Sequence, residues 1–373
     1  MGNANEDWYR INHVEDLDSP ALVIYTERVA ENISVLLSMI DDPLRLRPHV
    51  KTHKCREATQ LLMQSGVNKF KCATIAEAEM LGICGAADIL LAYQPCGPKQ
   101  MRLLKLVKKF PASKFSCLVD HLKPAREISE LFASQGLKIP VYIDLNLGQN
   151  RTGINVGKDA LELYEQCSLL PGIKPIGLHA YDGHIRDIDF SARKQKCDEA
   201  FAKIEAMQRE LLFRGFEEVI IVAGGSPTFS IHSKRKKIEC SPGTFIYWDR
   251  GYTILCPEQD FKPAALVISR VISLPTPTTL CLDLGHKSIA AENELTNRVY
   301  FINGAQLKAV SQSEEHLVVE AGADHHYQIG DLFYGIPVHI CPTIALYERA
   351  CTVEDGKIKG EWKTIARDRK IEI

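Results

Sequence analysis

The amino-acid sequence predicts an α/β protein, a (β/α)8 TIM-type barrel followed by a C-terminal all-β domain. From about residue 26 to 250, apolar or β-branched runs alternate with helix-like stretches, the pattern of a parallel sheet with helical crossovers. Eight such runs over about 220 residues match the size of a (β/α)8 barrel. Beyond about residue 255 helical periodicity is nearly absent, and short strand-like runs alternate with Pro, Gly or polar turns.

The barrel elements follow one another along the chain. The first helix is predicted with Thr26 as N-cap and one apolar face formed by Val29, Ile33, Leu36, Leu37 and Ile40. A doubly wound open sheet is the alternative, but no GxGxxG motif opens a first crossover. The predicted strands cover 44–50, 70–73, 88–93, 114–119, 139–147, 173–182, 218–226 and 238–247. The predicted helices include 54–66, 98–110, 121–136 and 193–214.

The strands predicted for the β domain cover 264–274, 278–283, 298–303, 306–311, 315–320 and 331–336. The run 20–25 is also strand-like and precedes the first barrel helix, so we expect it to join this domain. The sequence therefore predicts a barrel domain of residues 26–250 and a β domain formed by residues 1–25 together with 251–373.

Composition excludes several classes of protein. Of 373 residues, 45% are hydrophobic and 25% charged, as in ordinary soluble domains, and a net charge of −2 gives no reason to expect nucleic acid or an anionic membrane as partner. No apolar run reaches the roughly 18 residues that span a bilayer, and residues 1–10 are too polar for a secretory signal. The 12 cysteines contain no CxxC pair, which favours a reducing cytoplasm over a disulfide scaffold.

Lys51 lies where the first predicted barrel strand ends, in the run RPHVKTHK of residues 47–54. The carboxyl ends of barrel strands form the face on which such enzymes place their chemistry. Neighbouring cations and burial both favour a neutral amine over an ammonium group. A neutral lysine can form a Schiff base with an aldehyde, so Lys51 is a candidate anchor for a carbonyl cofactor. A basic cluster on a solvated turn is the alternative.

Glycine-rich and polar segments follow three further barrel strands. The segment Gly224-Gly225-Ser226 after the seventh strand can present backbone N–H groups to an anion, where barrel phosphate sites commonly lie. Arg151, in a glycine-flanked loop after the fifth strand, can face a phenolate or carboxylate with its planar fork. The end of the sixth strand has an active-site composition: His179, Tyr181, Asp182 and His184. The other side of the phosphate cradle is expected in the eighth strand, at Gly243 and Thr244.

His339 and Cys341 lie two residues apart in a segment predicted to be extended, so their side chains are expected to point the same way. Imidazole and thiolate together suit zinc. Two ligands alone are a weak motif, and a chance His-x-Cys is the alternative. The neighbouring Asp324, His325 and His326 either extend the set or form an ordinary polar turn.

Together these motifs resemble the fold-type III pyridoxal phosphate enzymes of the D-threonine aldolase and D-serine dehydratase family, relatives of alanine racemase. The resemblance runs from about residue 17 to 347 and is most specific at 47–54 and 339–343. It implies that Lys51 carries pyridoxal 5'-phosphate and that Arg151 lies beside its phenolic oxygen. The phosphate-binding residues would be Gly224, Gly225, Ser226, Gly243 and Thr244. Tyr181 and His184 would line the pocket, while His339 and Cys341 would bind a divalent metal, Zn or Mn.

The resemblance implies a lyase that acts on a D-configured β-hydroxy amino acid, by dehydration or by aldol cleavage. In dehydration Lys51 would remove the α-proton, whereas in aldol cleavage His53 or a metal-bound water would take the hydroxyl proton. Cys341 favours dehydration, because the family's aldolases tend to carry a carboxylate there. A homodimer is expected. The alternatives are an amino-acid racemase, with Tyr247, Tyr252 or Tyr334 as second acid/base, and a non-catalytic pyridoxal phosphate carrier.

Overall fold

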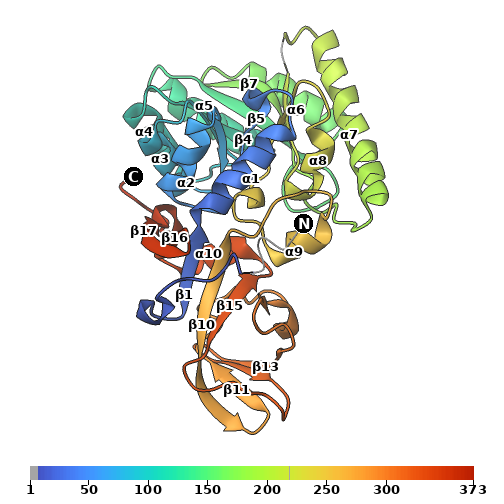
Figure 1. Ribbon diagram of the computed structural model, residues 1–373. Helices are drawn as coiled ribbons and strands as arrows, with labels where there is room; N and C mark the ends of the chain where they lie inside the picture. Colours follow the sequence, from blue (N-terminus) through green and yellow to red (C-terminus); the bar gives the residue numbers. More distant parts are fainter. Residues whose placement is uncertain (1–6, 218) are drawn as a thin grey trace. The chain divides into compact units, whose positions relative to one another are not determined.

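Figure 1 shows the computed structural model, which describes residues 7–217 and 219–373. The chain forms two compact units, each described here by itself. The β unit contains the described residues up to Ser34, Thr52–Cys55 and Thr244–Arg367. The α/β unit contains Val35–Lys51, the described residues of Arg56–Gly243, and Asp368–Ile373.

The α/β unit is built on a parallel sheet with the strand order β2-β3-β4-β5-β7-β8-β9, to which β6 is added beside β5. Each of these strands from β2 onward, except β6, corresponds to a predicted barrel strand; residue 218 at the start of the seventh predicted run lies outside the described residues. The strands are β2 (Lys69–Cys72), β3 (Asp88–Leu91), β4 (Lys114–Val119), β5 (Ile139–Asn146), β6 (Ile154–Asn155), β7 (Ile173–Ala180), β8 (Ile220–Ala223) and β9 (Ile238–Cys240).

The first predicted barrel strand, 44–50, is not a regular strand. It begins with a 3-10 helix, η2 (Pro43–Arg45), and then makes two isolated parallel bridges, from Leu46 to Cys240 of β9 and from His49 to Lys71 of β2. Pro48 lies between these bridges, and a proline has no backbone N–H to donate to a ladder. The segment therefore touches both end strands of the sheet without forming a continuous ladder.

Helices follow most of the strands of this unit (Figure 1). The predicted helices at 54–66, 98–110, 121–136 and 193–214 are confirmed. Ile75–Cys84 was not predicted, because it is buried almost all round and so lacks an amphipathic face. The helices of this unit are α2 (Arg56–Gln64), α3 (Ile75–Cys84), α4 (Pro98–Lys109), α5 (Leu122–Ala133), α6 (Lys158–Ser168), α7 (Phe190–Phe213) and α8 (Phe229–His232), whereas α1 (Thr26–Ser38) belongs up to Ser34 to the β unit.

The interior of the parallel sheet contains charged residues as well as apolar ones. A buried apolar cluster is formed by Leu90, Leu118, Tyr142 and Val222. Towards the amino ends of the strands, buried Arg47 pairs with Asp88 and Glu239 at 2.7 Å each. Towards the carboxyl ends, Asp144 follows Tyr142 by two residues and so lies on the same face.

The β unit contains a nine-stranded sheet in which β1 pairs antiparallel with β10 and parallel with β16. The strand predicted at 20–25 therefore joins this sheet, and all six predicted strands between 264 and 336 are present. The strands are β1 (Ala21–Tyr25), β10 (Ala265–Thr276), β11 (Thr279–Leu282), β12 (Val299–Phe301), β13 (Lys308–Gln312), β14 (Leu317–Glu320), β15 (Leu332–Pro337), β16 (Arg349–Glu354) and β17 (Lys357–Lys363). Two short helices are α9 (Arg250–Leu255) and α10 (Ile340–Leu346).

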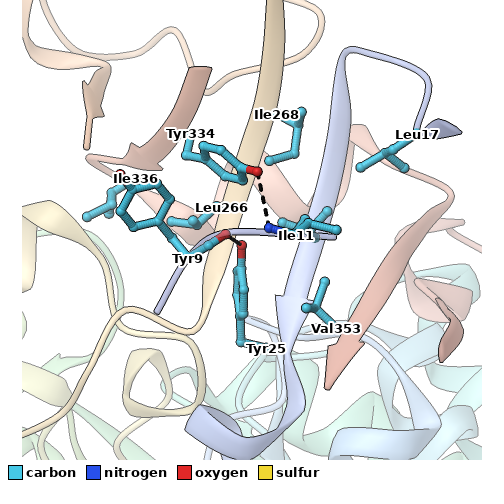
Figure 2. Close-up of a cluster of buried hydrophobic side chains, with 10 residues drawn as sticks. Tyr9, Ile11, Leu17, Tyr25, Leu266, Ile268, Tyr334, Ile336 and Val353 are labelled. Atoms are coloured by element: carbon cyan, nitrogen blue, oxygen red, sulfur yellow. Dashed lines mark hydrogen bonds between the residues drawn. The ribbon is translucent and has the colours of Figure 1, made fainter. Parts of the chain in front are cut away.

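Three tyrosines organise the core of the β unit (Figure 2). The hydroxyl of Tyr334 accepts a hydrogen bond from the Ile11 backbone N–H at 3.2 Å, and that of Tyr25 donates to the Tyr9 carbonyl. These bonds satisfy buried phenols and fasten the N-terminal segment to the sheet. Burial raises the pKa of Tyr334, so this core residue is poorly suited to the acid/base role weighed for a racemase.

Among the described residues, no helix has both the length and the apolar character needed to cross a membrane.

Candidate active site

Lys51 ends the segment that bridges β9 and β2 in the α/β unit. The Val50 N–H donates to the Lys71 carbonyl at 2.9 Å, and the Lys51 N–H donates to Nδ1 of His49 at 3.2 Å. These bonds fix the backbone of Lys51 next to the carboxyl end of β2, while its side chain is half-buried. The amine thus lies at the edge where catalytic groups of such sheets gather.

Tyr181, directly after β7, brings together two segments that are far apart in the sequence. The guanidinium of Arg151 lies 4.9 Å from the centroid of the Tyr181 ring. A Cβ atom placed on Gly225 would lie 3.0 Å from the same ring, so a side chain there would press against it. The predicted phosphate loop and Arg151 therefore both contact the Tyr181 ring.

The loop itself requires glycine and is tied to the segment after β9. Gly224 has φ +74, and a Cβ atom there would lie 2.7 Å from the His232 ring. Ser226 begins a short 3-10 helix, η3 (Ser226–Thr228), and its Oγ accepts a hydrogen bond from the Gly243 N–H at 3.3 Å. The structure thus joins Ser226 and Gly243, the two sides expected for a phosphate cradle. Thr244 belongs to the β unit.

A buried hydrogen-bond cluster supports this loop. Asp182 accepts from Thr228 Oγ1 at 2.7 Å and from His232 Nε2 at 2.8 Å. Burial alone would raise the pKa of Asp182, but the hydrogen bonds that its carboxylate accepts hold it below its ordinary value. The thiol of Cys197 lies 3.6 Å from the carboxylate and 3.4 Å from His232 Nε2. These three groups are close enough together to form a possible metal site.

The protons on His232 argue against a metal at this cluster. Arg235 Nη1 lies 2.7 Å from Nδ1 of His232, and a guanidinium can only donate, so Nδ1 must accept. The proton of the neutral ring is then on Nε2, facing Asp182. A metal bound at Nε2 would require Nδ1 to carry a proton and to face an acceptor. The hydrogen bonds therefore indicate a structural role, which is to hold Thr228 and the loop.

A second buried hydrogen-bond cluster, formed by Lys71, Asp144 and His179, lies at the carboxyl ends of β2, β5 and β7. His179 Nδ1 is 2.7 Å from Asp144 Oδ1, and His179 Nε2 is 3.4 Å from Lys71 Nζ. Burial and the charge of Lys71 lower the pKa of His179, whereas burial and the charge of Lys51 lower that of Lys71 to about 7. Lys71 and Asp144 were not identified from the sequence. The available signal was an ionisable residue near the carboxyl end of a predicted strand.

His184, predicted to line the cofactor pocket, is exposed and lines a cavity of the α/β unit. This cavity has a volume of about 490 Å³, and Asn146, Asp187 and Lys196 also line it. A Cβ atom on Gly148 would lie 3.2 Å from His184 Nε2, which explains a glycine there with φ +115. Tyr181 is not among the lining residues of the cavity. The role of His184 at the cofactor stays a prediction.

The predicted metal ligands lie in the β unit, but not in an extended segment. β15 ends at Pro337, His339 is the N-cap of α10, and Cys341 lies in its first turn. The extended conformation predicted for this segment is therefore wrong, because the chain turns into a helix that the His-x-Cys spacing did not reveal. The two side chains nevertheless form a hydrogen bond.

Glu292 fixes the orientation of the His339 ring. Its carboxylate lies 2.5 Å from Nδ1, which leaves Nε2 as the nitrogen able to bind a metal. Burial alone would lower the pKa of His339, but its hydrogen bond with Cys341 and the charge of Cys341 raise it to about 9. A histidine with a carboxylate behind it and a thiol beside it has the composition of a metal-binding pair.

Two hydroxyls surround Cys341. Thr52 Oγ1 lies 3.2 Å and Thr244 Oγ1 3.7 Å from its sulfur. Asp249 accepts from the Ile340 N–H at 3.0 Å and so holds the start of α10. Thr244, predicted to bind phosphate, thus contacts the thiol that is predicted to bind metal. Of the further candidates near residue 325, His325 stacks on Tyr327 with 6.0 Å between ring centroids.

His53 is buried in the β unit beside Cys55, whose backbone N–H donates to His53 Nδ1 at 3.3 Å. Burial lowers the pKa of His53 to about 3, so the ring is neutral near pH 7 and a weak base. Among the described residues, its Nε2 has no hydrogen-bond partner. The base role predicted for His53 stays a prediction, and this ring is better suited to hydrogen bonding through Nε2.

The fold and these residues define the class of protein. Residues 24–251 match the model of the alanine racemase N-terminal domain, and the chain belongs to this family. Residues 264–353 match a second model, described as "Putative serine dehydratase domain".

The chain is similar over nearly its full length to characterised lyases. It is 26% identical to the D-threonine aldolase of Arthrobacter sp., over 94% of this chain and 93% of that protein. It is 23% identical to the 3-hydroxy-D-aspartate aldolase of Paracoccus denitrificans, over 95% and 93%. The D-threonine aldolase from Filomicrobium marinum shares the fold, with a TM-score of 0.84 and 24% identity over 94% of this chain and 96% of that one. A shorter match of 25%, over 62% of each chain, is to the D-threo-3-hydroxyaspartate dehydratase of Delftia sp..

Proposed function

We propose that this protein is a lyase dependent on pyridoxal phosphate and a divalent metal, acting on D-configured β-hydroxy amino acids. The two family models cover both the segment with Lys51 and the segment with His339 and Cys341. The relatives named above are aldolases and a dehydratase that act on such compounds.

The observation that carries this proposal is the convergence at Tyr181. Its ring is contacted by the guanidinium of Arg151, and it fills the space that a Cβ atom of Gly225 would need. A phosphate-binding loop and a permanently charged arginine around one aromatic ring suit a planar cofactor with a phenolate and a phosphate. Lys51, at the end of the segment that bridges β9 and β2, supplies the amine that such an aldehyde cofactor needs.

These residues fit pyridoxal phosphate in the chemistry of their donor groups. Lys51 would hold it covalently, Arg151 would face its phenolic oxygen, and the loop Gly224-Gly225-Ser226 would bind its phosphate with Gly243. Segment 46–50 would close the parallel sheet into a (β/α)8 barrel, which is supported by its bridges to β9 and β2. We also propose the barrel domain of residues 26–250 and the β domain of residues 1–25 with 251–373.

The metal is proposed to bind at His339 and Cys341, as Zn or Mn. The donor set fits, because Glu292 occupies Nδ1 and so leaves Nε2 of His339 available beside a thiol. Cys341 would bind as thiolate. The cluster of Asp182, Cys197 and His232 is the other possible site, but the bond from Arg235 disfavours it.

The chemistry follows from these groups. Pyridoxal phosphate, when bound, supplies an electron sink for a carbanion at Cα, and the metal supplies a Lewis acid for the β-hydroxyl. With the cofactor bound, Lys51 would be the base that removes the α-proton in dehydration. In aldol cleavage a base must instead take the hydroxyl proton. His53 is the candidate from this chain, and burial, which lowers its pKa to about 3, makes it a weak base.

Dehydration is the favoured outcome, because Cys341 stands where the family's aldolases tend to have a carboxylate. None of the 12 cysteines, all of which lie among the described residues, forms a disulfide. This supports the proposal of a reducing, cytoplasmic location. A homodimer is proposed from the family resemblance.

Product analysis tests the function. Purified protein is incubated with D-serine, D-threonine and D-3-hydroxyaspartate, with and without a chelator, and the products are identified as keto acid, aldehyde or enantiomer. We expect keto acid or aldehyde, lost on chelation and restored by Zn or Mn. Enantiomer formation that is insensitive to the chelator would instead indicate a racemase and would remove the metal from the mechanism. Cys341→Asp is expected to shift the products towards aldehyde.

A further inference from the structure

The α/β unit contains a second amine close to Lys51. Lys71 is 2% exposed, on β2, and its carbonyl accepts the hydrogen bond from the backbone of Val50. Its Nζ lies 3.4 Å from His179 Nε2 and 5.7 Å from the centroid of the Tyr181 ring, which is also the ring beneath Arg151. The function proposed above does not use this group.

Some features of the environment of Lys71 favour its neutral amine, and others favour the charged ammonium form. Burial is the largest influence and favours the neutral amine, as do the positive charges of Lys51 and Arg47. The carboxylates of Asp144 and Asp182 instead favour the charged form. Together these influences lower the pKa of Lys71 to about 7, so the amine can accept or release a proton at neutral pH. The titratable or charged groups that face it are Lys51, Arg47, Asp144, Asp182 and His179.

The side chains of His179 and Asp144 next to Lys71 can stabilise a proton on its amine. Asp144 lies 2.7 Å from Nδ1 of His179, and burial together with Lys71 keeps that imidazole neutral. A neutral ring that donates from Nδ1 to Asp144 has Nε2 as an acceptor. The Nε2 atom faces Lys71 Nζ, so an ammonium group formed on Lys71 would find a hydrogen-bond acceptor and, beyond it, a negative charge.

We propose that Lys71 is the proton-accepting partner of Lys51, the group that takes the proton Lys51 must lose before it can react with an aldehyde. This inference rests on the proposed role of Lys51. In the step, the Lys51 ammonium gives one proton to the neutral Lys71 amine, directly or through water. Lys51 Nζ then forms a C=N bond with the aldehyde carbon, and the aldehyde oxygen leaves as water. His179 and Asp144 are positioning residues that stabilise the charged Lys71.

The test follows the loading of apoenzyme with pyridoxal phosphate. Samples are quenched with borohydride at timed intervals, and the modification of Lys51 is quantified by peptide mass spectrometry between pH 6 and 9. In the unsubstituted protein we expect the rate to rise as the pH passes about 7, where Lys71 loses its proton. Lys71→Ala should slow loading about a hundredfold at pH 8, in the range of a lost general base.

Chemical rescue separates proton transfer from a merely structural role. Imidazole and trimethylamine can accept a proton but cannot form a stable Schiff base, and they should restore loading of Lys71→Ala in proportion to their concentration. Lys69→Ala is the matched control on the same strand, where Lys69 pairs with Glu239 at 2.5 Å. We expect its loading to match that of the unsubstituted protein and to be unaffected by added imidazole.

The outcomes distinguish a Lys71 that accepts the proton of Lys51 from a Lys71 without this role. Loading of Lys71→Ala at the unsubstituted rate, or slow loading that neither amine restores, would overturn the role of Lys71. If Lys71→Ala fails to fold, judged by thermal unfolding, Lys71→Met is used with the same pH series, and an unchanged profile is the contrary result. Absence of any label on Lys51 in the unsubstituted protein would instead remove the proposed function itself.

Discussion

Nδ1 of His339 lies 2.5 Å from the carboxylate of Glu292, so the histidine presents its other nitrogen to a metal. Partners of this kind raise the basicity of a ligand and fix its ring. We predict that Glu292→Gln weakens binding of Zn about tenfold. Competition with a chromophoric chelator measures the affinity.

The control is Glu294→Gln, two residues further along the same exposed loop, where the side chain makes no capping hydrogen bond. Its affinity should equal that of the unsubstituted protein. Equal losses in both variants would mean that loop charge in general, and not the bond to His339, supports the metal.

A second prediction concerns the cluster beneath the phosphate loop. Asp182→Asn replaces an acceptor of hydrogen bonds from Thr228 and His232 with a group that also donates. We expect a loss of about 2–3 kcal/mol in the free energy of unfolding, the worth of hydrogen bonds to a buried charged group. Denaturant titration measures this loss, and weaker binding of pyridoxal phosphate should accompany it.

The same cluster allows a test of where the metal binds. A double variant, His339→Ala with Cys341→Ala, should contain no bound metal by elemental analysis. If the double variant still bound one equivalent of metal, and a triple variant that also carries Cys197→Ala bound none, the metal would reside at Asp182, Cys197 and His232. Our assignment of His232 as a hydrogen-bond donor to Asp182 would then be wrong.

The third prediction is a pH dependence of stability. Burial lowers the pKa of Lys71 to about 7 in the folded protein from an ordinary value of 10.5 in the unfolded chain, so between these values the unfolded chain binds more protons. Stability contributed by this group therefore rises with pH across that window, by about 1.4 kcal/mol per pH unit. Below about pH 7 both states are protonated and the slope vanishes.

Comparison of apoenzyme with Lys71→Met isolates this contribution. The free energy of unfolding of both proteins is measured by denaturant titration from pH 6 to 9. The value for the unsubstituted protein minus the value for the variant should be constant below about pH 7 and should increase above it. A difference that stays constant over the whole range would mean that Lys71 does not titrate near neutrality.

Strand and helix periodicity predicted most of the α/β unit and the strands up to 336, because those elements have one apolar face or a continuous apolar run. Several elements differ from the prediction or were missed by it, and three of them have a clear physical reason. The run 44–50 is apolar but contains Pro48, which prevents a continuous ladder. Ile75–Cys84 is buried on nearly all sides and shows no helical face. β16 and β17 contain many exposed polar residues, so their pattern is weak.

For the site, the sequence indicated residues that carry recognisable motifs. Lys51, the loop at Gly224 and the pair at His339 were predicted in this way, and their roles stay predictions. Lys71, Asp144 and Glu292 were missed, because their importance depends on which side chain lies opposite them in space. His184, which was predicted beside Tyr181 from a polar cluster in the sequence, lines a cavity whose lining does not include Tyr181, and its role stays a prediction.

Covalent binding of pyridoxal phosphate to Lys51 can be tested directly. The purified protein, loaded with pyridoxal phosphate, is reduced with borohydride and digested, and the labelled peptide is identified by mass spectrometry. We predict a single pyridoxyl phosphate adduct on Lys51, absent from Lys51→Ala. An adduct on another lysine, or equal labelling of Lys51→Ala, would contradict the account.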